Sequence, residues 1–250
     1  MKNLETILMT ATLLIFAVPY GRTDPTPNAA KSDKMAAAKK AEERGDLARV
    51  HQNFSLAVGY YQAALRVNRQ DAALYNKLGI AELQLTQRGA ARKYFTIAEK
   101  CDPNYIPAIN NLGAVALLDK KYRSAVDFFK QALAMDESVA STHLNLAEAW
   151  VGAGEMDRAM TEYTRALELD SDLLNSSREG VIARVMTPEQ RARVMFYVAK
   201  SYAKRGNIEG ALDYLGRARD LRYPDLKKVY SDPDFAAVCK DPRLAKIVKP

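Results

Sequence analysis

The sequence predicts an all-α fold, organised as a solenoid of stacked helix pairs. Two observations carry this prediction. A pattern of small and aromatic residues recurs every 34 residues, and within each period the apolar residues follow helical spacing. The composition agrees, because 48% hydrophobic and 27% charged residues in a chain of 250 are typical of a globular protein and exclude a wholly disordered one.

The amino-terminal segment has the layout of a secretory signal. Residues 7–18 form an apolar run that is shorter than the roughly 20 residues of a membrane-spanning helix. We therefore expect residues 1–23 to be a signal peptide and the mature protein to be periplasmic or secreted. The alternative is an uncleaved segment that anchors the protein to a membrane. Residues 24–37 contain two prolines and many polar side chains, and are predicted to be a flexible lead-in.

The repetition is seen when the chain is divided into blocks of 34 residues. Such blocks begin at Ala38, Ala72, Ile106, Ala140 and Ala192. We number the places of each block from 1 to 34. Places 8, 20 and 27 always hold glycine or alanine, and place 24 holds Tyr61, Phe95, Phe129, Tyr163 or Leu215. Four repeats therefore fill residues 38–173, an insertion occupies 174–191, and a fifth repeat fills 192–225.

Each block contains two amphipathic stretches joined by a short polar turn, which predicts an antiparallel helix pair. The small residues would let the paired helices approach to about 8–10 Å, and the large residue at place 24 would fill the adjoining space. One helix pair cannot bury its apolar surface alone. We therefore expect neighbouring pairs to stack into a continuous core.

This pattern resembles the tetratricopeptide repeat, whose consensus has small residues at places 8, 20 and 27 and an aromatic residue at place 24. The resemblance covers residues 38–225 apart from the insertion. It implies a right-handed α-solenoid of tetratricopeptide helix-turn-helix repeats, in which the first helices line a concave groove for extended peptides. The first repeat departs from the pattern at Ala41 and Arg44, where bulky apolar residues usually stand, and is expected to be a capping repeat.

The same resemblance identifies candidate groove residues by their places in the repeat. They are Asn76, Lys77, Ile80, Asn110, Asn111, Leu117, Leu144, Asn145, Glu148, Phe196 and Lys200. Asn111 and Asn145 both occupy place 6, and a carboxamide can donate to and accept from the backbone of an extended peptide. We expect these two residues to bind peptide backbone; the alternative is that their amides are solvated or cap neighbouring groups.

A chaperone-tail adaptor is not expected. The carboxylate clamp of chaperone-binding members requires lysine and asparagine at places 5 and 9. Here place 5 holds Glu42, Asn76 and Asn110, and place 9 holds Asp46, Ile80 and Ala114.

Two segments lie outside the repeats. The insertion contains the apolar stretch VIARVM, which is predicted to be extended and either folds into the groove as a lid or packs on the edge of the solenoid. Thr187 and Pro188 then predict the start of a helix. Residues 226–250 are predicted to form a cap, because Asp232-Pro233 and Asp241-Pro242 are typical helix starts. Its apolar residues Phe235, Val238, Leu244 and Ile247 would cover the last repeat.

The sequence shows no sign of catalysis. Cys101 and Cys239 are separated by six predicted helices, so we expect two free thiols rather than a disulfide. His51 and His143 have no nucleophile or metal ligand at a motif spacing, and Trp150 is expected in the core. Phosphate-binding loops and nucleophile motifs are absent from the sequence. We expect no enzyme activity, no cofactor, no metal and no small-molecule substrate; the partner should be another protein or a peptide.

The net charge of +7 is unevenly distributed. Repeat four has two basic and seven acidic residues, whereas residues 192–250 have thirteen basic and seven acidic residues. An acidic module beside a basic one suits the orientation of a charged protein partner. The alternative is that repeat five and the tail bind nucleic acid or an anionic surface, but places 2 and 5 show no base-reading pattern.

Overall fold

The computed structural model describes residues 27–170, 173 and 187–249, and within them the protein consists of helices and turns. The helices of the repeats are α1 (Pro27–Val50), α2 (Phe54–Leu65), α3 (Ala72–Gln84), α4 (Arg88–Cys101), α5 (Ile106–Leu118), α6 (Tyr122–Met135), α7 (Ala140–Gly152), α8 (Met156–Leu169), α9 (Pro188–Lys204) and α10 (Ile208–Asp220). The tail contains the 3-10 helices η1 (Leu226–Tyr230), η2 (Pro233–Phe235) and η3 (Val238–Lys240) and the short helix α11 (Leu244–Ile247).

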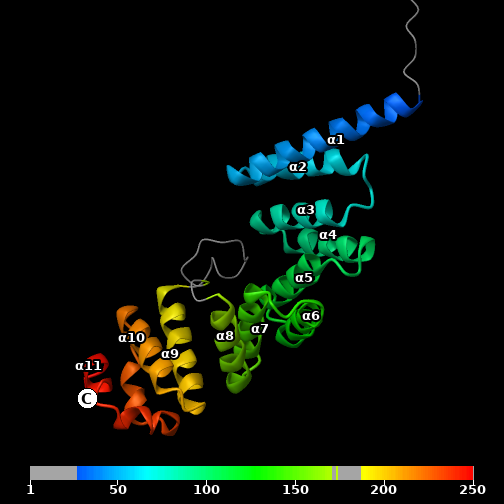
Figure 1. The fold of residues 1–250 in the computed structure, drawn as a ribbon. Coiled ribbons are helices and arrows are strands. Elements are labelled where there is room, and N and C mark those ends of the chain that lie inside the picture. The colour runs from blue at the N-terminus through cyan, green and yellow to red at the C-terminus, as the bar shows by residue number, and fades with distance from the viewer. Residues whose placement is uncertain (1–26, 171–172, 174–186, 250) are drawn as a thin grey trace, which may run out of the picture.

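Five helix pairs, α1/α2 to α9/α10, follow one another in chain order along the molecule (Figure 1). Each second helix packs against the first helix of the next pair, and the tail packs on α9 and α10. The predicted fold class is therefore confirmed: a right-handed α-solenoid with a C-terminal helical cap. No helix in the described ranges combines the length and the apolar character that crossing a bilayer requires.

The helices keep the 34-residue period of the sequence. The second helices of the first four pairs begin at Phe54, Arg88, Tyr122 and Met156. The first helices α3, α5 and α7 begin at Ala72, Ile106 and Ala140, which are the block starts that the sequence predicts.

The small residues of the pattern lie where two helices touch. A methyl group on Gly79 at place 8 would lie 2.5 Å from the ring of Phe95 at place 24. Gly45 and Gly113 are packed as tightly against the ring at place 24 of their own repeats. The alanines at places 20 and 27 are buried in all five repeats. The repeated pattern is therefore steric, as the sequence predicts.

The turn between the two helices of each pair has the same backbone in every repeat. Place 15 is left-handed, with φ between 58° and 82°, and is Gln52, Thr86, Lys120, Gly154 or Gly206. The following residue donates its N–H to the carbonyl five residues earlier, as Gln87 does to Glu82 at 2.9 Å. This arrangement closes the first helix and directs the chain into the second.

The amino-terminal boundary differs from the prediction. Residues 24–37 were expected to be a flexible lead-in, but α1 begins at Pro27 and runs without a break into repeat one. Proline is well suited to the first helical turn, and the Met-Ala-Ala-Ala stretch at 35–38 and the flanking lysines are good helix formers. The proposed signal peptide at 1–23 lies outside the described residues.

The carboxyl-terminal elements agree more closely with the sequence. Helix α9 begins at Pro188, and the side chains of Thr187 and Gln190 form a capping box at its start. Asp232 caps η2 as predicted, whereas α11 begins two residues after Pro242. The cap residues Phe235, Val238 and Leu244 are buried. The apolar stretch at 181–186, and with it the lid hypothesis, lies outside the described residues.

Candidate functional site

The candidate residues lie on the first helices α3, α5, α7 and α9, at different depths. Five of them are buried: Asn76, Asn111, Leu144, Asn145 and Phe196. Six are half-exposed: Lys77, Ile80, Asn110, Leu117, Glu148 and Lys200. We call the half-exposed side chains at places 2, 5, 6, 9, 12 and 13 of α3, α5 and α7 the first-helix face; it consists of Ala73, Lys77, Ile80, Asn110, Leu117, Leu118, Ser141, Glu148 and Val151.

A ladder of polar contacts joins the first helices. The side chain at place 6 of one repeat donates to the side chain at place 5 of the preceding repeat, 35 residues earlier. The three donor–acceptor pairs are Lys77 to Glu42 at 2.7 Å, Asn111 to Asn76 at 2.8 Å and Asn145 to Asn110 at 3.4 Å. These contacts stabilise the stacking of neighbouring repeats, since buried polar groups need hydrogen-bond partners.

The ladder changes what the asparagines can offer a ligand. The amide nitrogens of Asn111 and Asn145 face a neighbouring asparagine, and both residues are buried. Asn110 is half-exposed, and its carboxamide oxygen accepts from Asn145 and from the Thr142 hydroxyl at 3.2 Å. Because its oxygen is occupied, the NH₂ group of Asn110 is the amide donor that the face presents to another molecule.

A second contact links place 24 to place 9 within a repeat. The hydroxyl of Tyr61 donates to Asp46 at 2.8 Å, and the hydroxyl of Tyr163 donates to Glu148. Repeats two and three have phenylalanine at place 24 and the apolar Ile80 or Ala114 at place 9. This contact could have been predicted from the sequence. A tyrosine at place 24 occurs with a carboxylate at place 9, and a phenylalanine at place 24 occurs with an apolar residue at place 9.

The carboxylate of Asp46 is fully paired. One oxygen accepts from Tyr61 and the other from Lys77, whose ammonium lies 2.7 Å away and also contacts Glu42. Burial by itself would lower the pKa of Lys77, but the hydrogen bonds that its ammonium donates to Asp46 and Glu42 raise it overall. Burial, together with the Asp46 hydrogen bond, also raises the pKa of Tyr61, which keeps its hydroxyl a donor.

The carboxylate of Glu148 is only half paired. Tyr163 donates to one oxygen, and within the described ranges the other oxygen forms no hydrogen bond or ion pair. Burial raises the pKa of Glu148, and the Tyr163 hydrogen bond and the charge of Arg193 only partly oppose this effect. Glu148 is thus a half-exposed acid with an available oxygen on the first-helix face.

At repeat five the predicted site residues are covered by the protein's own cap. The ring of Phe196 lies 5.0 Å from the ring of Tyr223 and 5.3 Å from that of Phe235. Lys200 forms ion pairs with Asp232 at 2.6 Å and Asp234 at 3.1 Å. Among the candidate residues, the half-exposed ones on α3, α5 and α7 are therefore those that the cap leaves uncovered.

The remaining reactive side chains have structural contacts. In His143, Nδ1 lies 2.6 Å from the carboxylate of Glu162, and Nε2 lies 3.0 Å from the carbonyl of Glu137. Both ring nitrogens are thus occupied. Trp150 is buried between the cations of Lys130 and Arg158. Across the described residues, no three His, Cys, Asp or Glu side chains gather to hold a metal. Cys101 is half-buried and Cys239 is exposed, and both are free.

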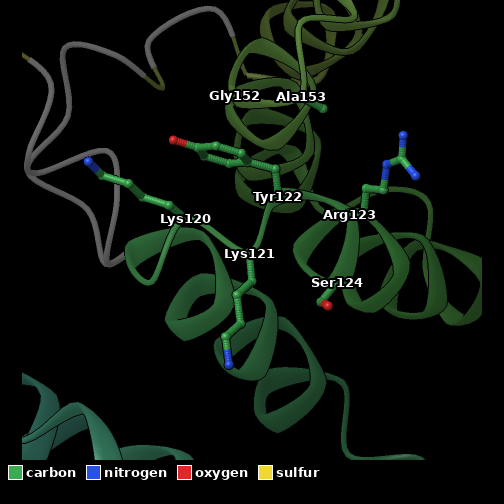
Figure 2. A pocket seen from close by; sticks show the side chains of 7 residues that line it. All are labelled: Lys120, Lys121, Tyr122, Arg123, Ser124, Gly152 and Ala153. Atoms are coloured by element: carbon green, nitrogen blue, oxygen red, sulfur yellow. The ribbon is translucent and has the colours of Figure 1, made fainter.

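A pocket of about 420 Å³ lies where the α5–α6 turn meets the end of α7 (Figure 2). It is lined by Lys120, Lys121, Tyr122, Arg123, Ser124, Gly152 and Ala153. The ring of Tyr122 lies against Gly152, where a methyl group would be 2.2 Å from the ring. The three cationic side chains point in different directions in Figure 2, so they do not surround a common point.

Two family models match the chain, both described as tetratricopeptide repeat. They cover residues 42–106 and 116–175, which together are half of the chain. The Hsp70-Hsp90 organizing protein of Triticum aestivum is 20% identical over 225 residues, which are 85% of this chain and 37% of that protein. The chain spans between 21% and 38% of the length of the curated relatives that it matches.

Solved structures share the fold at low identity. PilF of Pseudomonas aeruginosa has a TM-score of 0.59 and 18% identity, over 82% of this chain and 89% of that one. YrrB, described as a TPR protein with an unusual peptide-binding site, has a TM-score of 0.54 and 17% identity, over 82% of this chain and 96% of that one. At these identities the likeness concerns the fold alone.

Proposed function

Because the chain belongs to the tetratricopeptide-repeat family, we propose that it is a protein-interaction scaffold that binds an extended segment of a partner on its first-helix face. The carrying observation is the composition of that face. The half-exposed side chains of Ile80, Leu117, Leu118 and Val151 offer apolar surface on three successive first helices. The amide NH₂ group of Asn110 lies among them. The hydrogen bonds that its carboxamide oxygen accepts fix the orientation of the amide, so the NH₂ group can donate to a peptide carbonyl.

The relatives support this proposal at a coarse level. The wheat relative is named for organising two chaperones, and the YrrB structure is described by its peptide-binding site. The chaperone-tail clamp remains absent from places 5 and 9 of the sequence, so the bound segment on this chain should be recognised by other chemistry.

We place this activity in the periplasm or outside the cell. The support is the pattern of the first 23 residues, whose apolar run is followed by a proline and a glycine. An uncleaved segment that anchors the scaffold to a membrane is the alternative location.

The structure favours this function over binding of nucleic acid or an anionic surface at the basic carboxyl-terminal end. Several of the cations there are paired within the protein. Lys200 and Lys204 contact Asp234, Arg205 contacts Glu168, and Arg243 contacts Glu209 and Asp241. Such pairing reduces the charge that a phosphate backbone would meet.

Selection of displayed 12-residue peptides on the purified protein tests the proposal, followed by fluorescence polarisation with a labelled peptide that was selected. Asn110→Ala should weaken binding about fivefold to tenfold, because it removes one hydrogen-bond donor from the face. Gln131→Ala is the matched control, since Gln131 is an exposed amide on α6, outside the face, and should bind as the parent does. Equal affinity of the Asn110→Ala variant and the parent would contradict the assigned role of Asn110, and the recovery of no binding peptide would contradict the function.

A further inference from the structure

The repeats contain the same tyrosine–carboxylate pair twice, and the two copies differ in one partner. In repeat one, Asp46 accepts from Tyr61 on one oxygen and from the ammonium of Lys77 on the other. In repeat four, Glu148 accepts from Tyr163 on one oxygen, and within the described part of the chain its second oxygen has no partner. The chain itself therefore shows which kind of group completes this arrangement.

The missing group can be traced to one place of the repeat. Lys77 stands at place 6 of repeat two, one repeat after Asp46. The corresponding place 6 of repeat five is Tyr197, which has no cation to offer to Glu148. Burial and then Glu148 raise the pKa of Tyr163, and the charge of Tyr197 adds to this effect. The repeat pattern therefore puts an aromatic side chain where repeat two has a lysine.

Arg193 of α9 does not take the place of Lys77. It forms no ion pair with Glu148, and its charge only partly offsets the burial of that carboxylate. A half-buried carboxylate without a cation in contact costs free energy in the unbound protein. A cost of this kind is expected where a ligand supplies the missing partner.

We propose that Glu148 recognises a lysine or arginine side chain in the bound segment. The cationic group of the ligand donates to the second oxygen of Glu148, as Lys77 donates to Asp46 within the protein. This inference rests on the proposed peptide-binding function and adds the class of partner: an apolar extended segment with one basic residue.

The test compares peptides selected by the parent protein with those selected by Glu148→Gln. The parent should enrich one lysine or arginine among apolar residues, and the variant should lose this enrichment. A labelled peptide from the parent selection should bind Glu148→Gln about tenfold more weakly, because a charge-assisted hydrogen bond is replaced by a neutral one. The same peptide with norleucine in place of its lysine should bind both proteins alike.

Two further variants control the measurement. Asp127→Asn removes an exposed carboxylate from α6, outside the face, and should leave binding unchanged. Arg193→Gln removes the competing charge and should strengthen binding of the basic peptide; weakening would show that the site takes a carbonyl or carboxylate and would overturn the proposal.

Failure of this inference differs from failure of the proposed function. If the parent selects peptides that lack a basic residue, or if Glu148→Gln binds the basic peptide as tightly as the parent, the role of Glu148 is wrong while peptide binding stands. If neither protein selects any peptide, both are wrong. Thermal unfolding of Glu148→Gln shows that a loss of binding does not come from a loss of folding.

Discussion

The carboxylate of Glu148, which accepts a hydrogen bond from Tyr163, affects the stability of the fold in a way that depends on pH. Burial raises the pKa of Glu148, so the folded protein holds a proton on this side chain more tightly than the unfolded chain does. A raised pKa of this kind contributes stability that is fully present below the unfolded-state pKa and is lost as the pH rises through the folded-state pKa. Above the folded-state pKa the ionised carboxylate therefore destabilises the unliganded fold.

Glu148→Gln should consequently be at least as stable as the parent at pH 7. The advantage of the variant should shrink as the pH falls, because the parent carboxyl becomes protonated and is then neutral, as the glutamine amide is throughout. Urea unfolding at several pH values, followed by the fluorescence of Trp150, measures this difference. Tyr163, Tyr197 and Arg193 are present in both proteins, so the difference between the two reports on residue 148. A variant that is less stable than the parent at pH 7 would contradict this account.

At the scale of an element, the turn between the paired helices combines a constant backbone with a variable sequence. Place 15 is left-handed in all five repeats, yet it is glycine only at Gly154 and Gly206. Thr86 adopts φ of 62° with a β-branched side chain, which is strained in this region. The hydrogen bond from the Gln87 N–H to the Glu82 carbonyl closes the end of α3, and this closure requires the left-handed backbone at Thr86.

Thr86→Gly should raise the free energy of unfolding by about 1 kcal/mol, because the steric strain of a left-handed residue outweighs the extra entropy of glycine in the unfolded chain. Chemical denaturation followed by circular dichroism measures the change. The reverse substitution, Gly154→Thr, is the matched control in repeat four and should lower stability. A destabilised Thr86→Gly variant would show that the threonine side chain makes a contribution larger than its strain.

The helices could be predicted from the sequence because their signals are local and steric. Gly79 and Phe95 must match in size wherever a helix pair packs, so the period of these residues places the helices almost to the residue. The ladder could not be predicted in the same way. Whether Asn111 binds a ligand or Asn76 depends on the offset between stacked helices, and no pattern within a single repeat encodes this offset.

Contacts between distant parts of the chain also explain why two predicted groove residues of repeat five are covered. Phe196 and Lys200 have the places of groove residues, but the cap covers them through Phe235 and Asp232. These contacts join residues more than thirty positions apart outside the repeat pattern. The start of α1 at Pro27 also differs from the prediction, because the alanines and lysines that follow favour a helix and a proline is tolerated in its first turn.

At the scale of the whole molecule, the location of the scaffold is tested by the mass of the native chain. We predict that the protein purified from its own cells lacks about the first 23 residues, because a signal peptidase removes a segment of this layout. Intact-mass spectrometry with fractionation of the cell envelope measures this. A chain that retains Met1 and sediments with membranes would support the anchored alternative instead.

The direction of the polar ladder has a consequence for how such a protein can grow. Repeats two and three each have an acceptor side chain at place 5 and a donor side chain at place 6. Each repeat can therefore form a hydrogen bond with the repeat before it and with the repeat after it. A duplicated copy of residues 106–139 would bring Asn110 and Asn111 together and leave every connection matched. Repeat four keeps the donor Asn145 at place 6, but at place 5 it has Leu144, which cannot accept a hydrogen bond. An array of this kind can lengthen by duplication of a middle repeat without losing a hydrogen bond between repeats. A repeat added after repeat four would find Leu144 in place of an acceptor and could not continue the ladder.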